Sequence, residues 1–135
     1  MSQNLVKANI KGLDMAPRKV GEVIALVRGR SASDALVILA HTPRRAAKPV
    51  MKLINSAKAN ATNNHGLREE GLRITEITVT AGPRMKRYRP VARGMAHPFQ
   101  KRTSHVSVTL SGDKKPVKKV TKPADEKPAK KEEAK

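Results

Sequence analysis

The apolar residues near the amino terminus change from the period of a strand to that of a helix. Residues 4–13 alternate between polar and apolar side chains, which predicts a short strand with one polar face. Over residues 16–31 the apolar side chains recur at helical spacing, with Pro17 at the expected first helical position and Gly29 at the expected left-handed end. Asp14 is the expected substitute cap, because the residue before Pro17 has no side-chain acceptor.

Two further helices are predicted between residues 31 and 64. A serine, Ser31 or Ser33, opens the first, and its expected inner face consists of Ala35, Leu36, Leu39 and Ala40. Thr42 is interpreted as the N-cap of the second and longer helix, placed at about residues 43–64 with the proline as its first residue. The apolar stripe of this helix consists of Ala46, Ala47, Val50, Leu53, Ile54, Ala57 and Ala61.

The opposite face of the longest predicted helix is cationic. No acid occurs between Asp34 and Glu69, and the basic residues on this face are Arg44, Arg45, Lys48, Lys52 and Lys58. A charged outer face is usually just solvated, and this interpretation stays open for each single residue. The run as a whole favours contact with phosphate groups.

Two later segments alternate as strands do. Residues 73–80 carry apolar side chains at every second position, with a one-residue slip near Thr75 and Glu76, and the matching partner strand carries Val106, Val108 and Leu110. Two strands are not stable alone, so we expect them to join the amino-terminal strand and to lie against the helices. The predicted fold class is α+β, with three helices packed on a small antiparallel sheet.

Between these two strands lies a basic segment, residues 84–102, with seven Lys or Arg, no acid and both aromatic residues of the protein. It has too many like charges and too little apolar surface to contribute to a core. We therefore predict a long protruding β-hairpin arm over residues 80–106, which at about 3.3 Å per residue projects roughly 30 Å. An arm of this charge requires an anionic partner.

The tip of the arm is expected to be an irregular loop over residues 90–98, because pairing is interrupted there by Pro90, Gly94 and Pro98. Two interpretations of the aromatic residues stay open. Tyr88 and Phe99 either stack on unpaired bases or pack against each other across the hairpin.

Composition places the chain among polyanion-binding proteins. The net charge is +18, and the part up to Asp113 alone holds 20 basic and 7 acidic residues. We expect one domain over residues 1–111, followed by a disordered tail rich in Lys, Pro, Ala and Glu over residues 112–135. There is no cysteine, no expected signal peptide and no run of apolar residues long enough to cross a bilayer, which predicts a soluble cytoplasmic protein.

No pattern of catalytic or metal-binding residues is recognised. The four histidines, His41, His65, His97 and His105, have no partner at a metal-ligand or relay spacing, and no glycine-rich phosphate loop occurs. We expect no enzyme activity, no cofactor and no metal. A histone-like architectural DNA-binding protein stays open as the alternative, since such proteins also combine a small body with long basic arms.

Specific strings then indicate a family. GPRMKRYRPVARGMAHPFQKRTSHVSVTL at 82–110, APRKVGEVIALVRGRS at 16–31 and HTPRRAAKPVMKLINSAKANA at 41–61 together resemble the large-subunit ribosomal protein twenty-two family in its bacterial form. The resemblance implies a body near the exit of the peptide tunnel, an arm along the tunnel wall and a role in subunit assembly. The implied partners are large-subunit (23S-type) rRNA, neighbouring large-subunit proteins and the nascent polypeptide, with no membrane and no homo-oligomer.

The resemblance also assigns site residues. RNA contacts are implied for the body at Arg18, Lys19, Arg44, Arg45, Lys48 and Lys58, and for the arm at Arg84, Lys86, Arg87, Arg89, Lys101 and Arg102. The implied tunnel-facing tip is Pro90, Val91, Ala92, Arg93, Gly94 and Met95. Val91 and Met95 depart from the family, which commonly has further basic residues there.

Overall fold

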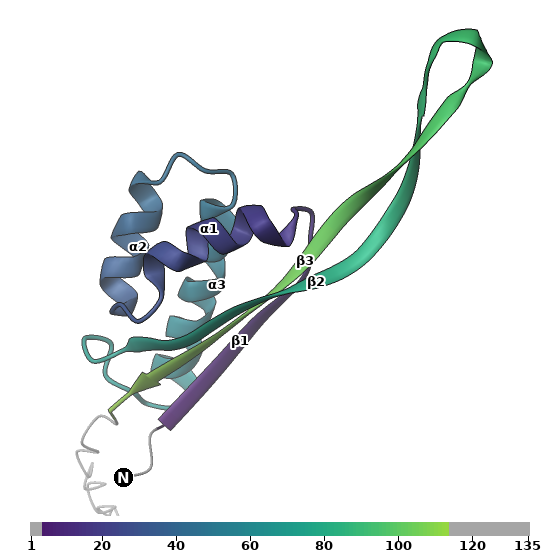
Figure 1. Ribbon diagram of the computed structural model, residues 1–135. Coiled ribbons are helices and arrows are strands. Elements are labelled where there is room, and N and C mark those ends of the chain that lie inside the picture. The colour runs from purple at the N-terminus through teal and green to yellow at the C-terminus, as the bar shows by residue number, and fades with distance from the viewer. Residues whose placement is uncertain (1–3, 114–135) are drawn as a thin grey trace, which may run out of the picture.

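The computed structural model describes residues 4–113 (Figure 1). Its elements are β1 (Asn4–Leu13), α1 (Pro17–Val27), α2 (Ala32–His41), α3 (Ala47–Ala59), a π-helical turn (Asn60–Asn64), β2 (Arg73–Pro90), a 3-10 turn (Ala92–Gly94) and β3 (Ala96–Gly112). The predicted α+β class is confirmed. The predicted tail lies outside the described residues, apart from its first two positions.

The three strands form one antiparallel sheet in the order β1-β3-β2. In Figure 1 the helices lie on one side of this sheet, and β2 and β3 continue together beyond it as the arm. The predicted slip is confirmed, because the β2–β3 register shifts between Ile74 and Glu76. A second shift, between Ala81 and Arg84, lies where the arm leaves the body.

The core lies between the helices and the inner face of the sheet. All seven residues of the predicted apolar stripe are buried, five of them on α3, and Val106, Val108 and Leu110 of β3 are buried as well. The prediction for α2 was wrong at one position, since Ala40 is exposed and Ala32 takes its place in the core. The helical and strand periods therefore identify which faces are buried.

Most predicted helix ends are confirmed. Pro17 begins α1, and Gly29 follows it with a φ of 73°. Ser31 is the N-cap of α2, and its Oγ accepts a hydrogen bond from the backbone N–H of Asp34 at 3.1 Å. The predicted capping by Asp14 is not observed, since α1 has no side-chain cap.

The predicted start of the third helix was wrong. Thr42 ends α2 instead, where its Oγ1 donates a hydrogen bond to the carbonyl of Ile38 at 2.7 Å, and α3 begins at Ala47. Pro49 explains the difference, because a proline inside a helix lacks an N–H and clashes with the carbonyl four residues before it. Beginning at Ala47 places Pro49 in the first turn, where neither cost applies.

The predicted irregular loop at the tip was too long. Strand pairing continues from Arg84↔Arg102 to Pro90↔Ala96 and includes Tyr88↔Pro98. Only residues 91–95 form the turn, which is closed by a hydrogen bond from the N–H of Val91 to the carbonyl of Met95 at 2.9 Å. Prolines fit this ladder because each strand of a two-stranded arm has a free edge toward which a missing N–H can point.

Candidate nucleic-acid interface

Cross-strand pairing divides the side chains of the arm between two faces. Directly opposed residues share a face and neighbours alternate, so one face holds Met85, Arg87, Arg89, His97, Phe99 and Lys101. The other face holds Arg84, Lys86, Tyr88, Pro98, Gln100 and Arg102. Each face thus carries three Lys or Arg, and all these side chains are exposed. The arm presents positive charge on both sides.

One cross-strand pair on the arm is repulsive. Arg84 and Arg102 are directly opposed, and like charges in that position destabilise a pair of strands. Arg87 donates hydrogen bonds only to the carbonyl of its neighbour Lys86, at 3.0 Å, and to the sulfur of Met85, at 3.8 Å. Among the described residues, the sole carboxylate paired with an arm cation is Asp14, at Lys101.

The two aromatic side chains of the arm do not face each other directly. Tyr88 lies opposite Pro98 and is 68% exposed, while Phe99 lies opposite Arg87 and is 48% exposed. Residues of both faces line one groove, with Phe99 from one face and Tyr88, Lys86, Pro98 and Gln100 from the other. The two aromatic rings are accessible to a partner.

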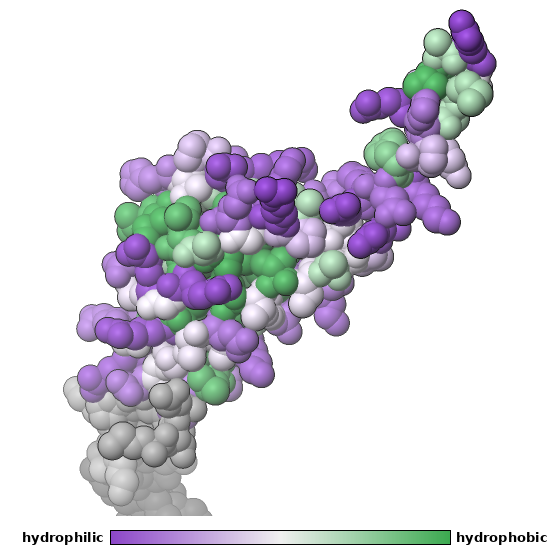
Figure 2. All heavy atoms as spheres, viewed as in Figure 1, coloured by the Kyte–Doolittle hydropathy of each residue, from purple (hydrophilic) through white to green (hydrophobic). Residues whose placement is uncertain are grey.

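The tip combines a left-handed backbone with apolar side chains. Arg93 has a φ of 61° and is the sole residue other than glycine with a positive φ in the described range; Gly94 follows with a φ of 70°. Val91 and Met95 are exposed, and Figure 2 shows apolar area at the end of an otherwise hydrophilic arm. The tip therefore differs chemically from the cationic ladder below it.

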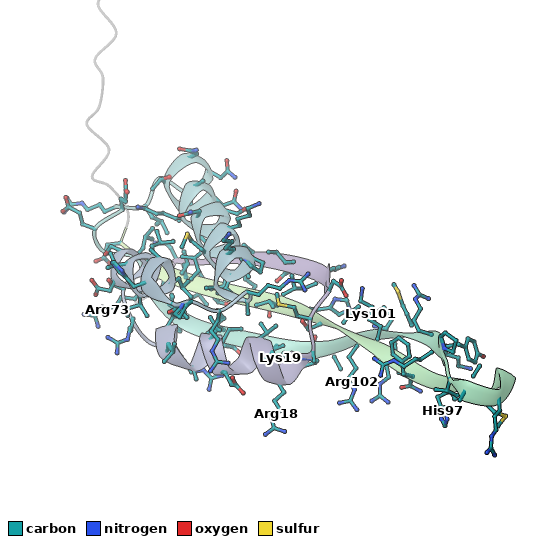
Figure 3. All side chains as sticks on the ribbon, turned by 90° about the horizontal axis from the view of Figure 1, so that it is seen from above. Arg18, Lys19, Arg73, His97, Lys101 and Arg102 are labelled. Atoms are coloured by element: carbon teal, nitrogen blue, oxygen red, sulfur yellow. The ribbon has the colours of Figure 1, made fainter. Side chains whose placement is uncertain are left out.

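The base of the arm brings together side chains from four parts of the chain. A pocket there is lined by the cations Lys19, Arg44, Arg45, Lys101 and Arg102, by the acids Asp14 and Glu22, and by Met15, Ala16 and Ala46. Five of the predicted RNA-binding residues are thus neighbours in space. Arg18 lies beside this group, and in Figure 3 it extends to the same side as Arg102.

The other predicted body contacts lie outside this pocket. Lys48 is exposed on α3, whereas Lys58 is half-buried and pairs with Glu69. Lys58 is also the least exposed of the three predicted cations that pair with a carboxylate, since its side chain is 25% exposed against 66% for Arg44 and 50% for Lys101.

Sequence reasoning missed the two acids of this pocket, Glu22 and Asp14, and of these Asp14 contacts the arm. Its Oδ2 lies 2.8 Å from Nζ of Lys101. The hydrogen bond from Lys101 lowers the pKa of Asp14; partial loss of water opposes this shift, and the charges of Lys101 and Arg45 reinforce it. The available signal was a single acid within a strongly basic part of the chain, but its partner is 87 positions away in the sequence.

The four histidines differ in exposure and in contacts. His105 is half-buried on the sheet, where its Nδ1 accepts a hydrogen bond from the backbone N–H of Gly12 at 2.8 Å. His41, His65 and His97 are exposed. Residues 4–113 contain no group of three metal-ligating side chains and no helix long and apolar enough to cross a membrane.

A comparison with protein-family models gives a match to this chain. The family model described as ribosomal protein L22p/L17e matches residues 8–111. The matched range extends from within β1 to the penultimate residue of β3 and so includes all three helices, the whole arm and the pocket at its base.

Proposed function

The chain belongs to the ribosomal protein L22p/L17e family, and from this premise we propose that it binds large-subunit rRNA along both faces of its arm and lines the peptide exit tunnel with the tip. Membership makes it a structural component of the large ribosomal subunit, which in bacteria is a cytoplasmic particle, and the family is of a structural, non-enzymatic kind.

The distribution of cations over two faces is the observation that carries the proposal. A domain that lies on the surface of an RNA needs cations on one face only. Here Arg87, Arg89 and Lys101 are on one face, while Arg84, Lys86 and Arg102 are on the other. A phosphate on the second face relieves the repulsion between Arg84 and Arg102, and phosphate contacts on both faces release counterions. The arm is thus suited to insertion between RNA segments.

The proposed body contacts are those around the base of the arm. Arg18, Lys19, Arg44, Arg45 and Arg102 lie at or beside one pocket, so a single RNA segment can reach several of them. Lys48 extends the basic surface along α3. By holding body and arm against different RNA segments, the protein supports assembly of the subunit beside neighbouring large-subunit proteins.

The tip is proposed to face an open passage. Phosphate contact requires cations, but of residues 91–95 only Arg93 is charged, and Val91 and Met95 are exposed and apolar. Such a surface is suited to weak contact with a passing polypeptide. The nascent chain in the exit tunnel is the partner that this position implies.

Photo-crosslinking tests the direction of the arm. A crosslinking residue placed at position 88 is expected to react with large-subunit rRNA, and one at position 93 with the nascent chain in a stalled ribosome. Position 37, an exposed site on α2, is the control and is expected to give no tunnel product. Reaction of position 93 with subunit-surface components alone would contradict the proposal.

A further inference from the structure

Two ion pairs inside the pocket at the base of the arm link parts of the chain that are distant in sequence. Asp14, after β1, pairs with Lys101 of β3 at 2.8 Å, and Glu22 of α1 pairs with Arg44 of the α2–α3 connection at 3.2 Å. The side chains of all four residues are at least 49% exposed. Exposed ion pairs contribute little to stability because water screens them and ordering long side chains costs entropy.

The charges of the pocket do not balance. Five cations line it and only two acids, so Lys19, Arg45 and Arg102 remain in positive excess after the two ion pairs are formed. The cations come from α1, from the α2–α3 connection and from β3, and they converge although like charges repel. Such convergence is typical of a site for an anion.

We propose that this pocket binds a phosphodiester group of RNA, and that Asp14 and Glu22 occupy Lys101 and Arg44 until the phosphate replaces them. The inference rests on the proposed function and specifies one contact within it. Arginine side chains bind phosphate with two parallel hydrogen bonds, and a lysine adds a compact charge. Because Asp14–Lys101 joins the body to the arm, the exchange fixes the base of the arm on RNA.

The exchange predicts an unusual sign for two substitutions. Breaking an ion pair in a binding site usually weakens binding. Here Asp14→Asn frees Lys101 and Glu22→Gln frees Arg44, and each of these cations otherwise has to separate from its carboxylate before it can bind phosphate. Each variant is expected to raise the affinity for RNA about two- to fivefold at low salt, the range that an exposed pair contributes. The gain should decline as salt rises, since salt also screens the competing carboxylate.

The test uses the full chain and a transcript of large-subunit rRNA, with dissociation constants measured over a series of salt concentrations. Glu76→Gln is the matched control: it changes the net charge equally, but Glu76 lines a different groove with Lys7, Asn9 and Thr78 on the sheet. Asp14→Asn and Glu22→Gln should each raise affinity more than Glu76→Gln. Equal gains in affinity for all three variants would mean a general effect of net charge and would overturn the proposal that this pocket binds phosphate.

A second comparison assigns the effect to the ion pair. In a Lys101→Gln background, Asp14→Asn should no longer raise affinity, whereas an undiminished gain would overturn the exchange. Equal competition by a polyglutamate peptide and by RNA would indicate an acidic protein partner in place of a phosphate. If the unaltered chain fails to bind the transcript at all, the proposed function fails as well, and that outcome is distinct from the others.

Discussion

Replacing Arg87 and Arg89 together by alanine is expected to weaken binding to large-subunit rRNA roughly 25- to 60-fold at about 0.1 M salt. Both residues lie on one face of the arm, and both are exposed. Each phosphate contact contributes about 0.7 to 0.9 to the slope of log affinity against log salt, so the slope should become shallower by about 1.4 to 1.8. Filter binding over a range of salt concentrations measures both quantities.

The matched control removes two arginines from the other end of the molecule. Arg73 lies at the end of the body away from His97 of the arm, as Figure 3 shows. Arg68 is at the same end, where its backbone N–H bonds to the carbonyl of Asp113. Arg68→Ala with Arg73→Ala gives the same net charge, and its slope should change less. An equal loss in both double variants would show that the arm is not a specific contact.

Replacing Ile54 by alanine is expected to lower the free energy of unfolding by about 2–5 kcal/mol. Ile54 is fully buried at the centre of α3, among the apolar stripe that contacts the sheet. Its truncation removes apolar contacts and leaves a cavity. Against a total of roughly 5–15 kcal/mol for a domain, this is a large part of the stability. Urea unfolding followed by circular dichroism measures the change.

The control for this prediction lies on the same helix. Lys52 is exposed, and Lys52→Ala should change the free energy of unfolding by no more than about 0.5 kcal/mol. A loss below 1 kcal/mol for Ile54→Ala would mean that α3 is not central to the core. The arm has no buried apolar residues between Arg84 and Arg102, so the body alone determines the stability of the folded chain.

The buried faces were predictable from the sequence, but one helix start was not. Burial follows from periodicity, and for that reason the stripe from Ala46 to Ala61 was predicted completely. The start of α3 depended on a competition between two prolines. Pro43 is favourable as a first residue, but a helix beginning there would place Pro49 in its interior, at a cost of about 3 kcal/mol. The second effect is the larger, and α3 begins at Ala47.

The presence of the arm was predicted, whereas the form of its tip was not. Prolines normally interrupt a sheet, which favoured a loop over residues 90–98. That rule applies to strands with neighbours on both sides, and the arm has none beyond its own two strands. Pro98 is therefore accommodated opposite Tyr88, and the turn contracts to residues 91–95.

The cations of the site were identifiable from the sequence, but their convergence was not. Lys19, Arg44 and Lys101 are far apart along the chain, and only the packing of α1, the α2–α3 connection and β3 brings them to one pocket. The role of Asp14 depends on the same packing, since its partner Lys101 lies 87 positions later in the sequence. Local patterns therefore indicate binding chemistry without locating the pocket.

Sedimentation through a high-salt cushion tests most directly whether the arm is enclosed by ribosomal RNA. The full chain is incubated with large ribosomal subunits assembled without it, in the presence of duplex DNA as competitor. The predicted result is that the chain still co-sediments with the subunit at high salt. An arm bound to RNA on both faces can dissociate only if all of its contacts are lost together. Release of the chain from the subunit by salt, with equal affinity for the duplex DNA, would contradict an arm enclosed by ribosomal RNA. It would favour an architectural DNA-binding protein.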